Sequence, residues 1–126
     1  MRVRIVYVKG NEASELQAQQ SLRSWQDHGW EADLWEGFTP ETLDRKKFPW
    51  PDMANGRLES FKTSEPHKHP IKTACLFNNL QFAQDVIEYN QPMVFAEHDT
   101  LCLSEYRGFW ADEFCYLSME YAFQPP

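Results

Sequence analysis

Two carboxylates, Glu97 and Asp99, close a short apolar stretch that begins at Met93. The stretch is typical of a β-strand, and residues two apart in a strand point to the same face. The two side chains would then meet on one ligand where the strand ends. Mg²⁺ and Mn²⁺ take oxygen ligands and usually keep positions for water or substrate phosphates. The pair is therefore a candidate metal–diphosphate site, although acidic residues after a strand are most often solvated turn residues.

The first part of the chain predicts a strand, a helix and a second strand. Residues 3–8 are rich in β-branched and aromatic side chains, as strands are. Asn11 is a good N-cap for the helix that follows, and Gly29 is the expected stop. A second strand is expected at residues 31–35. Residues 38–43 could begin a short helix, with proline at its first position.

The second part predicts a long helix and a third strand. From Leu76 to Ile87 apolar side chains recur at i, i+4, i+7 and i+11. This pattern favours a helix that begins near residue 71 and ends before Asn90. The strand at residues 93–97 follows it. Later apolar segments could extend the sheet or pair with it: Leu101 with Leu103, and residues 114–119.

Residues 45–70 show no periodicity and contain four prolines. Loops of this length inside a compact domain are usually functional or mobile. Trp50 lies between two of the prolines and could stack on a sugar or a base, or pin the loop to the body. His67 and His69 have no further ligands at zinc-site spacing, so we interpret them as solvated loop residues.

Composition limits the classes of protein to consider. With 126 residues, 42% apolar and 15% aromatic, residues 1–126 are expected to form a single globular domain. Twelve basic against 19 acidic residues give a net charge of −7, which argues against binding to nucleic-acid phosphates. We expect no signal peptide and no membrane span. Three cysteines without paired spacing favour a reducing, cytoplasmic location.

Alternation of strands and helices predicts an α/β domain with three layers and a mostly parallel sheet. In such sheets, ligands bind beyond the carboxyl ends of the strands. Residues 9–11, 36–37 and 97–99 each follow a predicted strand. These three segments are therefore expected to share one rim of the sheet.

Short motifs in this order resemble the donor-binding N-terminal half of GT-A fold glycosyltransferases, most closely the family 25 type that builds lipopolysaccharide and related glycans. The resemblance lies in five segments: residues 6–11 (VYVKGN), 21–22 (SL), 35–40 (WEGFTP), 74–79 (ACLFNN) and 95–99 (FAEHD). It covers roughly residues 1–105. Two departures stand out, because Asn78-Asn79 replaces a Ser-His pair and His98 replaces the middle acid of an acidic triplet.

For the cofactor and the reaction, the resemblance implies metal-assisted transfer of a sugar from a nucleoside diphosphate to an acceptor. Asp99, with Glu97 directly or through water, would hold Mn²⁺ or Mg²⁺ against the diphosphate. The resemblance assigns no residue as the general base.

For the substrate, the resemblance implies contacts along the rim. Lys9, Asn11 and the turn formed by Glu36 and Gly37 would border the nucleotide. Two further candidates lie on the long helix: Lys72, where backbone N–H groups could meet the diphosphate, and Asn79.

Members of this family are considerably longer, and their C-terminal half supplies much of the acceptor site. The chain ends 27 residues after Asp99. It could be a minimal transferase, a donor-binding remnant, or a part that a second copy or a partner protein completes. The alternative class is a non-catalytic, acidic α/β adaptor that keeps the scaffold and binds a partner.

Overall fold

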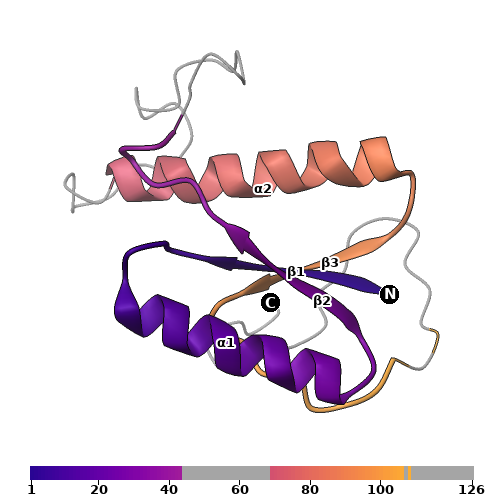
Figure 1. Cartoon of the computed structure of the whole chain (residues 1–126). Coiled ribbons are helices and arrows are strands. Elements are labelled where there is room, and N and C mark those ends of the chain that lie inside the picture. Colours follow the sequence, from indigo (N-terminus) through magenta and orange to yellow (C-terminus); the bar gives the residue numbers. More distant parts are fainter. Residues whose placement is uncertain (44–68, 107, 109–126) are drawn as a thin grey trace, which may run out of the picture.

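Three parallel strands form one sheet, and two helices connect them. The structure is a computed structural model that describes residues 1–43, 69–106 and 108 (Figure 1). Its elements, in chain order, are β1 (Arg2–Tyr7), α1 (Glu12–Asp27), β2 (Glu31–Glu36), α2 (His69–Tyr89) and β3 (Met93–Glu97).

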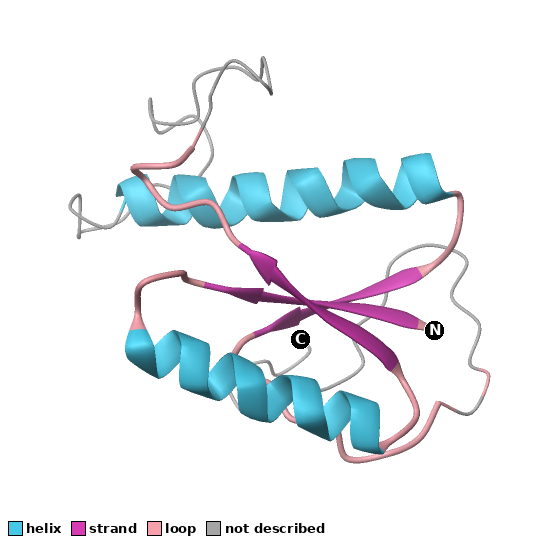
Figure 2. Cartoon of the chain, in the orientation of Figure 1, coloured by secondary structure: helices cyan, strands magenta, loops and turns pink. Residues whose placement is uncertain are grey.

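The central strand of the sheet is β1, with β2 on one side and β3 on the other. Ile5 of β1 aligns with Leu34 of β2 and with Ala96 of β3, and both pairings are parallel. Figure 2 shows α1 on one side of the sheet and α2 on the other. The expected α/β class, with alternating strands and helices and a parallel sheet, is therefore confirmed.

The apolar core lies between the sheet and α1. Val3 and Ile5 of β1 are fully buried there, because alternate residues of a strand share a face. Trp25 of α1 packs edge-on against Trp30, with 5.0 Å between ring centroids. The core also contains residues from β2, β3 and the segment after β3: Ala32, Ala96 and Cys102.

The α1 helix approaches the sheet through three small side chains and one tryptophan. Its buried residues are Ser14, Ala18, Ser21 and Trp25, whereas Leu16 is 63% exposed. The cap predicted from the sequence is present, since the Asn11 side chain accepts a hydrogen bond from the N–H of Ser14 at 3.0 Å. The helix ends where predicted, and the following glycine has a positive φ.

Polar contacts attach α2 to the opposite face of the sheet. Arg4 Nη1 lies 2.7 Å from Asp85 Oδ2, outside hydrogen-bond geometry, so the attraction is that of an ion pair. The Arg4 guanidinium also stacks over the ring of Trp35, 4.8 Å from its centroid. Gln81 donates to Asp85 Oδ1 at 2.7 Å. The rings of Phe82 on α2 and Phe95 on β3 pack edge-on, with 5.2 Å between their centroids.

The apolar stripe that predicted α2 does not face the sheet. Ile87 is 77% exposed and Ala83 is exposed, while Leu76 and Leu80 are half-buried. The buried positions are instead Thr73, Ala74, Phe77, Asn78 and Gln81. Periodicity thus identified the helix correctly but not its inward side.

The segment after β3 is a correction to the sequence-based expectation. Leu101 and Leu103 form no strand and are 60% and 86% exposed. Cys102 is buried between them, and its N–H donates to Ser24 Oγ at 2.9 Å. Trp30 Nε1–H donates to the Ser104 carbonyl at 3.0 Å. The segment therefore covers the end of α1 rather than widening the sheet.

The remaining predicted elements are a short helix at residues 38–43, a strand at 114–119 and the long loop before α2. Residues 38–43 contain a single turn, in which Thr39 O accepts from the N–H groups of Thr42 and Leu43. The residues 114–119, with Cys115, and the predicted loop up to residue 68, with Trp50 and His67, lie outside the described residues.

Cys75 and Cys102 are free thiols. Within the described residues, neither helix combines the length and apolarity that crossing a bilayer requires.

Replacing Asp85 with alanine should lower the free energy of unfolding by about 3 kcal/mol. It leaves the Arg4 guanidinium, whose side chain is 13% exposed, charged without its counter-ion. Urea titration followed by tryptophan fluorescence measures the change. Glu36→Gln is the control, because the Lys9–Glu36 pair is exposed and its loss should cost less than about 0.5 kcal/mol. Equal effects of the two substitutions would show that the Arg4 pair does not stabilise the fold.

Candidate functional site

Carboxyl ends of the three strands meet at one rim. Tyr7 aligns with Glu36, and Val6 aligns with Glu97, so β1 brings the two outer strands to the same edge. The connections from β1 and β2 lead to opposite sides of the central strand. This arrangement makes the gap between β1 and β3 a topological switch point, where ligands of open α/β sheets bind.

The rim has two sides, one toward each helix. Partners in parallel register share a face of the sheet, so Val6, Trp35 and Glu97 belong to the α2 side. Tyr7 and Glu36 belong to the α1 side by the same alternation. The two acids at the outer strand ends therefore leave the sheet on opposite faces.

Only one of the two predicted metal ligands is a strand residue. Glu97 ends β3, whereas Asp99 lies in a turn closed by a hydrogen bond from Thr100 N–H to Glu97 O at 3.1 Å. The same-face rule for strands thus does not reach Asp99. Both residues are exposed. Among the described residues, no three His, Cys, Asp or Glu side chains are grouped to hold a metal ion. Carboxylate oxygens are ligands that a hard cation prefers, and a cation held by these two residues would keep most of its positions for water or phosphate.

The pKa of the Cys75 thiol depends in part on the charge of Glu97. Burial raises the pKa of its thiol, and the nearby Glu97 carboxylate raises it further. Both effects disfavour the thiolate, the first by desolvation and the second by charge repulsion. The first turns of α2 are therefore close enough to the end of β3 for the two side chains to interact.

Hydrogen bonds within the chain occupy the amino end of α1. The N–H of Val8 donates to Ser14 Oγ at 2.9 Å, and the N–H of Gly10 donates to Glu15 Oε1 at 3.0 Å. Asn11, a predicted substrate contact, acts as the helix cap. A phosphate would have to displace these bonds, and would also meet the charges of Glu12 and Glu15. The α1 side of the rim is thus poorly suited to an anion.

The remaining predicted contacts are spread along the rim. Lys9 Nζ lies 3.7 Å from Glu36 Oε2, and both side chains are largely exposed. Lys72 lies in the first turn of α2 and is half-buried. Asn79 is exposed, and its side-chain N–H donates to the Cys75 carbonyl within the helix at 2.9 Å.

Gly37 is a packing position as well as part of the turn after β2. A Cβ atom there would lie 2.8 Å from Val6 Cγ1 and 3.3 Å from Tyr7 O. Only glycine therefore allows this approach to β1. The Gly37 N–H donates to Tyr7 O at 2.9 Å, which fixes the turn against the central strand.

Sequence reasoning missed the role of Asn78. Its side chain is 7% exposed and accepts a hydrogen bond from Phe38 N–H at 2.6 Å. A signal was present, because Asn78, Gln81 and Asp85 place polar side chains on one line of a mostly apolar helix. Such a line predicts a polar partner on the facing sheet.

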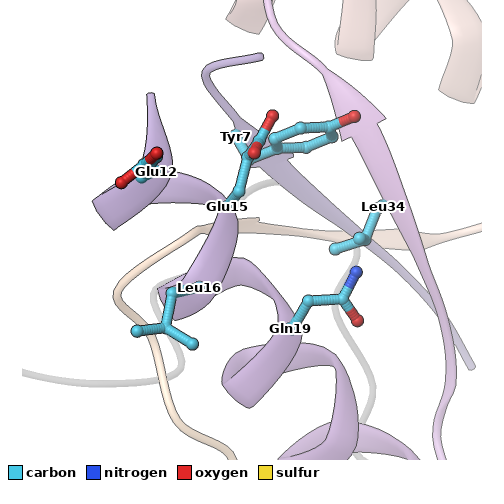
Figure 3. A pocket seen from close by; sticks show the side chains of 6 residues that line it. All are labelled: Tyr7, Glu12, Glu15, Leu16, Gln19 and Leu34. Carbon is cyan, nitrogen blue, oxygen red and sulfur yellow. The ribbon is translucent and has the colours of Figure 1, made fainter. Parts of the chain in front are cut away.

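An open pocket of about 470 Å³ lies on the α1 side (Figure 3). Figure 3 shows the Tyr7 ring and the Glu15 carboxylate next to each other at one end. Its lining residues are Tyr7, Glu12, Glu15, Leu16, Gln19 and Leu34. Two carboxylates and an aromatic ring suit a cationic group better than a phosphate.

Comparison of the chain with protein-family models, with curated proteins and with solved structures finds no match. The structure shows a small α/β fold with a parallel three-stranded sheet. The likeness to glycosyltransferases rests on the sequence motifs alone and stays a hypothesis.

Glu97→Gln should lower the pKa of the Cys75 thiol, because it removes the negative charge that disfavours the thiolate. The pKa should fall only part of the way, since burial is the larger cause. The pH dependence of alkylation by iodoacetamide measures it, and Cys75→Ser identifies the reacting thiol. Glu88→Gln, near the far end of α2, is the control. An unchanged pH profile in Glu97→Gln would contradict the proximity of the two groups.

Gly37→Ala should lower the free energy of unfolding by about 1–3 kcal/mol, because the new methyl group overlaps Val6 Cγ1. Val6→Ala removes that atom. In the double variant, part of the loss should therefore be recovered, which a double-mutant cycle in urea measures. Strictly additive effects would mean that the two positions do not touch.

Proposed function

We propose that the protein binds a nucleoside-diphosphate sugar together with Mn²⁺ or Mg²⁺ at the rim of the sheet, and transfers the sugar to an acceptor. The observation that carries this proposal is the position of Glu97. It ends the strand beside the central one, at the topological switch point, on the side of the sheet that α2 covers.

The charge at the rim supports a metal-dependent mode of binding. The described rim carries the carboxylates of Glu36, Glu97 and Asp99 against the cations of Lys9 and Lys72. Lys9 already pairs with Glu36, and the N–H groups of Val8 and Gly10 are already bonded. A diphosphate carries several negative charges, so it would be repelled unless a cation came with it. Metal-free binding should therefore be weak.

Each residue then has a separate part in binding. Glu97, and Asp99 directly or through water, would hold the metal, which when bound would offset the charge on the departing diphosphate. Lys72, in the first turn of α2, would attract the diphosphate from the same side. The exposed pair of Lys9 and Glu36 would border the nucleoside. No described residue is assigned as general base, and the acceptor side would come from a second copy or from a partner.

Mn²⁺ alone should bind weakly, and a nucleoside diphosphate should bind clearly only in its presence. Isothermal titration calorimetry with UDP, GDP, ADP and CDP, each with and without Mn²⁺, measures both. Glu97→Gln should weaken metal-dependent binding by roughly tenfold, because it removes a charged ligand, and Asp99→Asn should weaken it as well. Glu88→Gln, far from the rim on α2, should change nothing.

Equal affinity in wild type and both rim variants would contradict the assignment of the metal ligands. The adaptor alternative makes a different prediction, since such a protein would bind none of the diphosphates and would neither hydrolyse nor transfer a donor sugar. Release of the diphosphate from a donor, with or without an acceptor, therefore separates the two classes.

A further inference from the structure

Asn78 joins α2 to the turn that follows β2. Its side-chain oxygen accepts the hydrogen bond from Phe38 N–H at 2.6 Å, between residues 40 positions apart. Asn78 is almost completely buried, so breaking the bond leaves polar groups unpaired away from water. Because donor and acceptor belong to different elements, the bond fixes one element relative to the other.

The same turn is also held from the side of β1. The Gly37 N–H donates to Tyr7 O, and a Cβ atom on Gly37 would lie 3.1 Å from Asn78 Nδ2. The Phe38 ring packs edge-on against Trp35, with 5.6 Å between centroids. The turn therefore sits between the central strand and α2 with little room to shift, and Asn78 is its contact with the helix.

The turn also lies beside the part of β1 that pairs with the end of β3. A Cβ atom on Gly37 would lie 2.8 Å from Val6 Cγ1, and Val6 aligns with Glu97 in the parallel register. Since β1 separates β2 from β3, these two strands have no direct pairing, and Val6 lies between the turn and Glu97.

We infer that Asn78 is a positioning residue of the rim. It fixes the turn of residues 36–38 relative to Glu97, and so sets the geometry in which a metal-bound nucleoside diphosphate is held. The ligand in this inference rests on the proposed function, whereas the positioning rests on the bond to Phe38. Asn78 itself does not need to touch the ligand.

Three variants test the inference. Asn78→Ala removes the acceptor, Asn78→Asp keeps an oxygen in the same place, and Gln84→Ala removes an exposed amide from the same helix. Hydrogen exchange of the Phe38 amide, followed by NMR, reports on the turn. Calorimetry in the presence of Mn²⁺ measures affinity for whichever of UDP, GDP, ADP and CDP the wild type binds most tightly. Asn78→Ser replaces the alanine variant if that variant does not fold.

In Asn78→Ala the Phe38 amide should exchange at least about tenfold faster, and affinity for the metal-bound diphosphate should fall by about tenfold. Asn78→Asp keeps the acceptor oxygen and should restore slow exchange at Phe38, and Gln84→Ala should match wild type in both measurements. A residue that only stabilised the fold would lower the unfolding midpoint without changing affinity in the folded protein.

Unchanged exchange at Phe38 in Asn78→Ala would overturn the inference, as would faster exchange with undiminished affinity. A different result identifies failure of the proposed function. If wild type binds none of the four diphosphates with Mn²⁺, the proposed function is wrong and Asn78 positions no such site, whatever the exchange at Phe38 shows.

Discussion

Arg4 decides how α2 lies on the sheet. It occupies the middle of the central strand on the face that α2 covers, and a charge there needs a counter-ion because its burial is otherwise costly. Asp85 supplies that charge only when its side of the helix faces inward. The same rotation brings Gln81 and Asn78 to the sheet and leaves the stripe from Leu76 to Ile87 at least partly in solvent. An apolar stripe turned toward the sheet would bury more hydrocarbon but would leave Arg4 unpaired.

The two faces of the sheet are therefore built differently, and the difference reaches the rim. On the α1 side, apolar side chains and tryptophan rings form the core, and the amino end of the helix is closed by its own cap. On the α2 side, an ion pair and buried polar side chains lie between helix and sheet alongside the apolar contacts. An anionic ligand that arrives with a cation meets fewer occupied donors on the α2 side, where Glu97 and Lys72 are found. The apolar α1 side of the sheet is therefore structural, and the more polar α2 side is the candidate functional side.

Local signals predicted the elements, and tertiary contacts decided the rest. The N-cap Asn11 and the stop at Gly29 are short-range features, so the bounds of α1 followed from the sequence. The inward side of α2 did not, because it depends on Arg4, which is distant in the chain. For the candidate site, the parallel order of the strands was enough to place its segments on one rim. The turn that carries Asp99 away from the strand could not be predicted from alternation.

The segment after β2 is held by α2 as well as by the sheet. The strands β2 and β3 lie on either side of β1, so neither one restrains the other directly. Asn78 bonds to the turn after β2, and Cys75 responds to Glu97 at the end of β3. A ligand that reached from one strand end to the other would therefore bind most tightly when α2 keeps the setting that Arg4 and Asp85 impose. Loss of that ion pair, far from the rim, should thus weaken binding through the helix, in the way that supporting residues hold a site in its productive geometry.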